Sequence, residues 1–72
     1  MQDVTSQTFD TIVNGQACLL DFFAPWCQPC RVMDPLLKDV EKETGIPVMK
    51  INVDESPELA EKFRISNLPS LI

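Results

Sequence analysis

The stretch from Ala17 to Ala24 limits the fold of this chain more narrowly than any other part of the sequence. It is apolar apart from Asp21, and Gly15 and Pro25 stand on either side of it. Such a run is typical of a strand that is covered on both faces, as in the middle of a parallel sheet. The sequence therefore predicts an α/β protein rather than an all-helical or an all-β one.

A long amphipathic helix is expected directly after this strand, from Gln28 to about Thr44. Gly45 and Pro47 should end the helix, and Pro35 should bend it because its ring removes a backbone donor. We expect an apolar face to pack on the sheet while a charged face meets solvent. The apolar positions are Val32, Met33, Leu36, Leu37 and Val40. The charged positions assigned mostly to the other face are Arg31, Asp34, Lys38, Asp39, Glu41 and Lys42.

The remaining segments complete an alternation of strands and helices. Thr5 or Ser6 is expected to cap a first short helix with an apolar stripe of Phe9, Ile12 and Val13, and residues 48–53 should form a second buried strand. Ser56 should cap a further helix that begins with Pro57, and residues 70–72 begin another strand. This order predicts a single domain over residues 1–72 with a parallel core.

Charge and composition exclude several classes of function. The chain has 72 residues, a net charge of -5 and no histidine. An acidic chain is a poor partner for nucleic acid or an anionic membrane surface, and the missing histidine removes most hydrolase triads and the zincin pattern. No apolar run approaches the roughly 20 residues of a membrane helix. Since the first residues do not resemble a secretory signal, we expect a cytoplasmic protein.

The cysteines carry the clearest chemical signal. Cys27 and Cys30 form a Cys-x-x-Cys pair after the buried strand, and Cys18 stands apart. Haem attachment would need histidine at the position of Arg31, and a zinc site would need more ligands than the chain offers beside Cys18. A structural disulfide would close too short a loop to stabilise the fold much. A reversible dithiol/disulfide couple is therefore favoured, with the zinc site and the structural disulfide kept as alternatives.

The position of this pair suits redox chemistry. Cys27 should lie where the strand ends and the helix begins, so that unpaired backbone N–H groups and the helix dipole favour its thiolate. Cys30 would lie one helical turn behind, within reach of a mixed disulfide on Cys27. Pro29 suits the first turn because it lacks an N–H. Trp26 offers either a flat apolar surface for a substrate or an ordinary core side chain.

Asp21 is unusual because a carboxylate inside a buried strand is costly unless it is paired or protonated. If it is buried, desolvation should raise its pKa, so that it could accept and return a proton near neutral pH. Lys50 in the neighbouring strand is its expected basic partner. The alternative is that Asp21 points to solvent at a strand end and Lys50 extends past apolar neighbours to water.

Three segments of this sequence together resemble the thioredoxin family. Residues 21–31 (Asp-Phe-Phe-Ala-Pro-Trp-Cys-Gln-Pro-Cys-Arg) are similar to the family's active-site segment, and residues 50–54 to its next strand. Residues 65–70 resemble the turn before a later strand. The resemblance implies a three-layer fold around a mainly parallel sheet. It also implies reduction of protein disulfides, renewal by thioredoxin reductase, and no permanently bound cofactor.

The same resemblance implies a role for each site residue. Cys27 corresponds to the attacking thiol and Cys30 to the resolving thiol. Asp21 corresponds to the carboxylate that handles the proton of the resolving thiol, with Lys50 in support. The expected substrate-contacting residues are Trp26, Gln28, Pro29, Leu68 and the cis proline Pro69.

Some positions depart from the family pattern. Gln28 replaces the usual glycine, and Arg64 and Asn67 stand where glycines are common. Cys18 lies outside the motif and is expected to be a buried, inert side chain. The family continues beyond Ile72 with a hairpin strand and a last helix, so we expect an incomplete domain with an open edge along the strand of residues 19–23. Either the chain is a fragment or truncated form, or a second copy or another chain covers that edge. A self-associating interaction module with little turnover is the alternative function.

Overall fold

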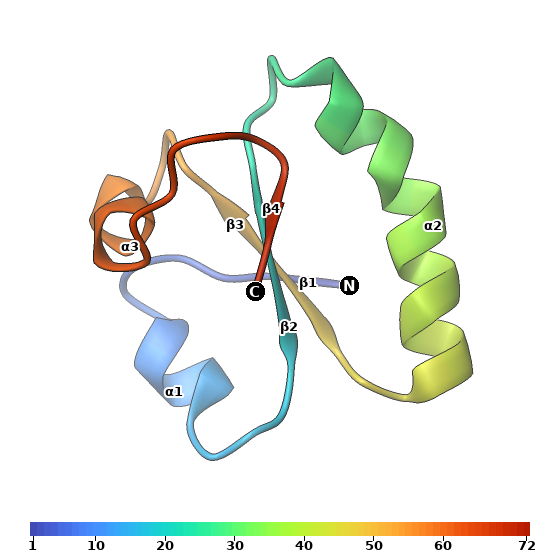
Figure 1. Ribbon diagram of the computed structural model, residues 1–72. Coiled ribbons are helices and arrows are strands. Elements are labelled where there is room, and N and C mark those ends of the chain that lie inside the picture. The colour runs from blue at the N-terminus through green and yellow to red at the C-terminus, as the bar shows by residue number, and fades with distance from the viewer.

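The centre of the fold is a four-stranded sheet in the order β1-β3-β2-β4, seen in a computed structural model that describes residues 1–72 (Figure 1). The strands are β1 (Gln2–Asp3), β2 (Leu19–Phe23), β3 (Val48–Asn52) and β4 (Ser70–Leu71). β1 and β2 run parallel to β3, and β4 runs antiparallel to β2. The predicted parallel core is therefore confirmed.

Helices cover both faces of this sheet. The helices are α1 (Phe9–Val13), α2 (Gln28–Thr44) and α3 (Pro57–Lys62). Figure 1 shows α1 and α3 on one side of the strands and α2 on the other, which gives the three layers that the sequence predicts. None of the three helices has the length and apolar character that crossing a membrane requires.

The side chains of β2 alternate between the two layers. Leu20 and Phe22 join the main apolar core, and the ring of Phe63 lies 5.5 Å from that of Phe22 and 5.7 Å from that of Phe9. Because successive residues of a strand point to opposite faces, Asp21 lies on the side of the sheet that α2 covers. The core members are Val4, Phe9, Leu20, Phe22, Met49, Ile51 and Leu59.

The bounds predicted for α2 are correct. Pro29 occupies its first turn, and Gly45 follows its end with a left-handed φ of 73°. The N–H of Gly45 donates to the carbonyl of Glu41, which closes the last turn. Glycine suits this position because other side chains are strained in the left-handed region.

The prediction of which face of α2 is buried is largely wrong. Val32, Leu36 and Val40 are exposed, whereas Leu37 is buried. Two carboxylates of α2 face the sheet instead, and each binds a polar group of β3. Glu41 accepts a hydrogen bond from the N–H of Val48 at 2.7 Å, and Asp34 binds the ammonium group of Lys50.

The side chains predicted to cap α1 and α3 do not form capping hydrogen bonds. Thr8, not Thr5 or Ser6, stands at the N-terminus of α1, where the carbonyl of Thr5 accepts from the N–H groups of Thr8 and Phe9. Ser56 does precede α3, but its hydroxyl does not cap that helix. Its Oγ instead accepts a hydrogen bond from the N–H of Ser6 at 3.1 Å.

The prediction that β2 has an open edge is also wrong, because β4 pairs along that edge. Asp21 pairs with Leu71 and Phe22 with Ser70. The backbones of Leu20 and Ile72 exchange hydrogen bonds of 2.9 and 3.0 Å. β2 therefore lies inside the sheet, and the two edge strands are β1 and β4.

Candidate active site

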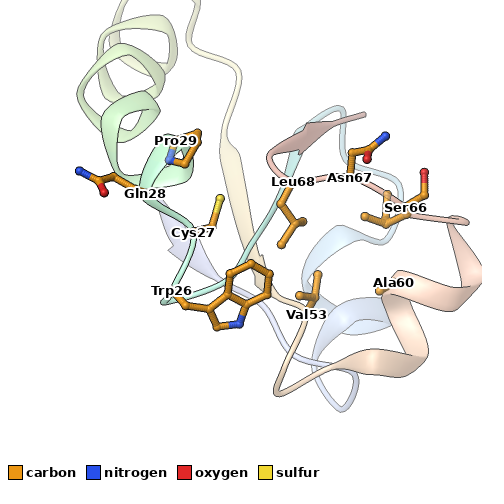
Figure 2. Close-up of a pocket in the computed structure, with 10 residues that line it drawn as sticks. Trp26, Cys27, Gln28, Pro29, Val53, Ala60, Ser66, Asn67 and Leu68 are labelled. Atoms are coloured by element: carbon orange, nitrogen blue, oxygen red, sulfur yellow. The ribbon is translucent and has the colours of Figure 1, made fainter.

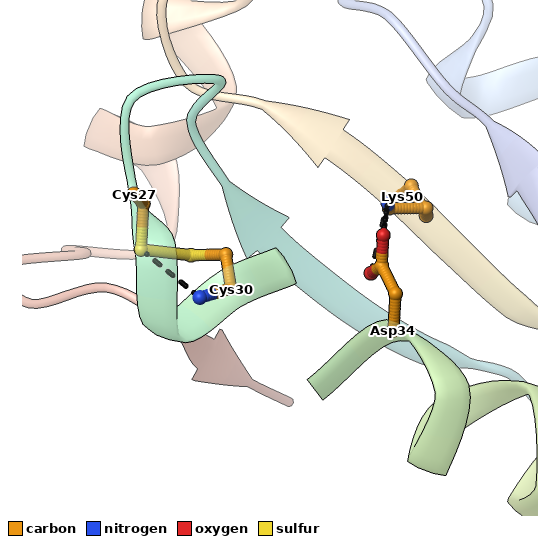
Figure 3. A network of polar contacts seen from close by, with 4 residues as sticks. All are labelled: Cys27, Cys30, Asp34 and Lys50. Atoms are coloured by element: carbon orange, nitrogen blue, oxygen red, sulfur yellow. Dashed lines mark hydrogen bonds and ion pairs between the residues drawn. A yellow bond between two sulfur atoms is a disulfide. The ribbon is translucent and has the colours of Figure 1, made fainter. Parts of the chain in front are cut away.

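A disulfide joins Cys27 and Cys30 at the N-terminus of α2. Cys27 is the extended residue before the helix, and the backbone N–H of Cys30 donates to its Sγ at 3.3 Å. The two Cα atoms are 5.4 Å apart, and both residues are buried (Figure 3). The predicted pairing and its position at a helix terminus are therefore present in the structure.

A groove of about 700 Å³ opens beside Cys27. In Figure 2 the sulfur of Cys27 lies between Pro29 above it and Trp26 below it, with Leu68 across the groove. The lining residues are Trp26, Cys27, Gln28, Pro29, Val53, Ala60, Ile65, Ser66, Asn67 and Leu68. An apolar groove of this size next to a disulfide can receive an extended peptide.

Four of the expected substrate-contacting residues meet in this groove, and one does not. Trp26, Gln28, Pro29 and Leu68 line it. Pro69, whose peptide bond with Leu68 is cis, lines a neighbouring apolar hollow of about 660 Å³ together with Gln28 and Pro29.

The far wall of the groove was missed in the sequence. The far wall consists of Val53 from the connection after β3, Ala60 from α3, and residues 65–68 from the connection between α3 and β4. Val53 and residues 65–68 fall in segments that resemble the thioredoxin family, but only Leu68 was expected to contact a substrate. Ala60 carries no motif, and only the folded chain brings it to the groove.

Trp26 is a surface residue, so the core interpretation is wrong. Its side chain is 71% exposed, and its Nε1–H donates to Oδ2 of Asp54 at 3.0 Å. This bond holds the indole at the mouth of the groove. Asp54 is thus a supporting residue that sequence reasoning did not identify.

Asp21 is buried with 1% exposure, so the solvent-facing alternative is wrong. Neither of its carboxylate oxygens has a hydrogen-bond partner. Burial raises the pKa of Asp21, the charge of Lys50 opposes this rise, and the charge of Asp34 adds to it. The sequence prediction of a raised pKa is in line with this environment.

Lys50 lies beside Asp21 in the sheet, but its ammonium group binds a different carboxylate. The two residues are register partners in β2 and β3. The Nζ of Lys50 lies 3.0 and 2.9 Å from the two oxygens of Asp34 and 4.4 Å from the ring centroid of Phe23 (Figure 3). Sequence reasoning placed Asp34 on the solvent side, although its spacing of four residues from Cys30 was a usable signal.

The third cysteine takes no part in the site. Cys18 is a free, half-buried thiol that packs against the main core. No group of three or more histidine, cysteine, aspartate or glutamate side chains is arranged to hold a metal ion.

Comparisons with known proteins agree with this fold and site. The sequence model of the family Thioredoxin matches residues 1–72. A thioredoxin from Chlamydia pneumoniae is 39% identical over 70 residues, covering 96% of this chain and 69% of that protein. A thioredoxin from Bacillus subtilis (strain 168) is 37% identical over 70 residues, covering 94% of this chain and 67% of that protein.

Solved structures give the same result. A mutant thioredoxin from Halobacterium salinarum NRC-1 superposes with a TM-score of 0.89 at 33% identity, over 99% of this chain and 65% of that one. Mitochondrial thioredoxin 3 from Saccharomyces cerevisiae, in its oxidised form, gives a TM-score of 0.88 at 27% identity, over 99% of this chain and 70% of that one. The chain spans about two thirds of the length of these relatives.

A fold of this kind with a disulfide at the N-terminus of α2 is that of a thiol–disulfide oxidoreductase. The matches extend along the whole chain and include the segment with both cysteines. The chain belongs to the thioredoxin family.

Proposed function

We propose that this protein reduces disulfide bonds in other proteins through the Cys27–Cys30 couple. The observation that carries the proposal is a disulfide at a helix N-terminus, with Cys27 lining an apolar groove beside it. A helix N-terminus favours the thiolate, which is the form that attacks a disulfide.

In the first step, the thiolate of Cys27 attacks one sulfur of the substrate disulfide. A mixed disulfide forms between Cys27 and the substrate, and the other substrate sulfur leaves and takes up a proton. In the second step, Cys30 loses its proton and attacks Sγ of Cys27. The bond between Cys27 and the substrate breaks, the second substrate sulfur leaves and takes up a proton, and the Cys27–Cys30 disulfide forms. The substrate has then gained two electrons from the cysteines and two protons, one released by Cys30 and one from solvent.

Asp21 is the proposed acceptor for the proton of Cys30, directly or through a water molecule. It is buried on the sheet face that α2 covers, and burial raises its pKa, which makes the carboxylate a better proton acceptor. Lys50 supports it as the nearest cation, since the two residues are register partners.

The proposed substrate is an extended polypeptide segment that lies in the groove. Trp26 and Pro29 would contact its apolar side chains, and Gln28 would contact its polar groups. The backbone near Leu68 and Pro69 would pair with the segment as a short strand. Flat and apolar walls suit many sequences, so this site would accept a range of protein disulfides.

A trapping experiment tests the mechanism. In Cys30→Ser, the mixed disulfide on Cys27 cannot be resolved, so substrate proteins should remain covalently attached and separate on adding dithiothreitol. Cys27→Ser should trap nothing, and Cys18→Ala, which changes only the cysteine outside the site, should keep full insulin-reducing activity. A folded Cys30→Ser protein that traps no disulfide substrate would refute the mechanism.

By family analogy, the proposed electron donor is an NADPH-dependent thioredoxin reductase, and the proposed location is the cytoplasm, where thiols are kept reduced. Adding NADPH and a bacterial thioredoxin reductase should replace dithiothreitol in the insulin assay. Sedimentation of the same sample separates the alternative function. An inactive oligomer would favour an interaction module, and an active monomer would exclude it.

A further inference from the structure

Asp34 lies at the active site, although the proposed mechanism gives it no task. It follows Cys30 by four residues on α2, so the two side chains lie on the same side of the helix. Both oxygens of Asp34 bind the ammonium group of Lys50 (Figure 3). The pair is partly shielded, with side-chain exposures of 32% for Asp34 and 15% for Lys50.

Two carboxylates therefore compete for one ammonium group. Asp21 is the register partner of Lys50, yet both of its oxygens have no hydrogen-bond partner. The charged and titratable groups on its side of the sheet are Asp3 from β1, Lys50 from β3, and Cys30, Asp34 and Glu41 from α2. The amino group of Met1 is bound to Glu41. From β4 the residue opposite Asp21 is Leu71, which carries no charge. Lys50 is the only cation near Asp21, and Asp34 holds it.

A cavity connects this ion pair with the resolving cysteine. It has a volume of about 280 Å³, and Cys30, Asp34, Lys50 and Arg31 are among its lining residues. The guanidinium of Arg31 donates to the carbonyl of Pro25, so Lys50 is the cation left to neutralise a carboxylate here. The space is large enough for water molecules, which need polar partners such as these.

The geometry points to Asp34 as a positioning residue that holds Lys50 away from Asp21 and so sets the pH range in which Asp21 accepts the proton of Cys30. This inference rests on the proposed function, because it concerns the step in which Cys30 attacks the mixed disulfide. Asp34 itself exchanges no proton in that step, so the protons and electrons of the two thiol reactions balance as in the proposed mechanism. The negative charge of Asp34 also adds to the rise in the pKa of Asp21, in line with this role.

The test follows the two thiol reactions separately. Reduced protein is mixed with dithiobis(nitrobenzoate) in a stopped-flow instrument, and the release of nitrothiobenzoate is recorded at several pH values. The first phase reports attack by Cys27, and the second reports displacement by Cys30. Asp34→Asn removes the charge and keeps the shape, so Lys50 becomes free to pair with Asp21.

We expect the pH profile of the second phase to move to lower pH by about one unit in Asp34→Asn, while the first phase stays unchanged. Asp34→Glu keeps the charge and should restore the original profile. Lys50→Gln should move the profile in the opposite direction. If Asp34→Asn does not fold, Asp34→Ser removes the same charge and takes its place.

The decisive control is Asp21→Asn. In that background, Asp34→Asn should leave the profile of the second phase unmoved, because Asp34 acts through Asp21. An unmoved profile in the single variant, or an equal shift without Asp21, would overturn the inference. Absence of any second phase in the unsubstituted protein would instead refute the proposed function, so the two failures are distinguishable.

Discussion

The backbone N–H of Cys30 donates a hydrogen bond to Sγ of Cys27 at 3.3 Å. The disulfide loop thus directs a backbone N–H of the α2 N-terminus at the sulfur of Cys27. A donor of this kind stabilises a thiolate more than a neutral thiol.

In the reduced protein, we therefore expect iodoacetamide to alkylate Cys27 before Cys30, at a rate about tenfold higher or more. Peptide mass spectrometry of samples quenched at successive times measures both rates. Cys18 is an internal reference, since it packs against the main core and should react more slowly than Cys27. Faster labelling of Cys30 would contradict the assignment of the nucleophile.

Trp26→Ala should lower kcat/KM for a protein disulfide by about tenfold, which corresponds to about 1.4 kcal/mol of lost contact. A small disulfide that does not reach the indole should react at an unchanged rate. Because Trp26 is exposed, the free energy of unfolding should change by no more than about 0.5 kcal/mol. Asp54→Ala removes only the hydrogen-bond acceptor of the indole, so a smaller loss is expected. Equal losses for both substrates would exclude a role in substrate binding.

Asp21→Asn should stabilise the protein at pH values above the raised pKa of Asp21. The pKa of Asp21 is raised above its ordinary value of 3.8, so its contribution to stability is fully present below that value. The contribution is lost as pH rises through the raised pKa, where a charge becomes buried without a partner. Urea unfolding above that pKa should show a gain of about 1–3 kcal/mol for the variant, and a smaller gain in acid. A variant that is less stable throughout would contradict this account.

Glu41 should show the opposite pH dependence. The hydrogen bond from the N–H of Val48 is the main reason that its pKa is lowered from 4.5, and the amino group of Met1 adds to this. Its contribution to stability is therefore present above that value and lost as pH falls through the lowered pKa. Glu41→Gln should be less stable than the unsubstituted protein at neutral pH, and the two unfolding curves should converge in acid. Glu43→Gln, at an exposed position, should change neither curve.

Ser56→Ala should lower the free energy of unfolding by about 1 kcal/mol or more, because it leaves the N–H of Ser6 without its acceptor. The matched control is Ser6→Ala, which keeps that backbone N–H and removes only an exposed hydroxyl bonded to Glu58. Thermal unfolding should therefore separate the two variants. Equal melting temperatures would mean that the buried hydroxyl of Ser56 contributes nothing.

The features that sequence reasoning located correctly are those with local causes. Pro29 and Gly45 act within a single helical turn, so the bounds of α2 could be predicted from them. The spacing of Cys27 and Cys30 likewise determines their pairing once a helix begins between them. The apolar character of residues 17–24 predicted a central strand, and β2 has neighbours on both sides.

The features that it missed depend on tertiary pairing. Asp34 was assigned to the solvent-facing side of α2, and only the packing of α2 on β3 brings Lys50 to it. The hydroxyl of Ser56 has an ordinary capping position, and only the folded chain offers Ser6 as a competing donor. Strands are predicted both at residues 17–24 and at residues 70–72, but nothing local to either segment indicates that they pair with each other.

The parallel direction of β2 and β3 has a practical consequence. Their carboxyl ends carry the reactive disulfide and the groove, whereas their amino ends follow the connections at residues 14–18 and 45–47. Gly15 and Ile46 are exposed in these connections, at the opposite end of the sheet from Cys27. A resin, a dye or an electrode attached there would leave the sulfur free to meet large proteins. The molecule thus has its reactive disulfide at one end of the sheet and exposed attachment sites at the other.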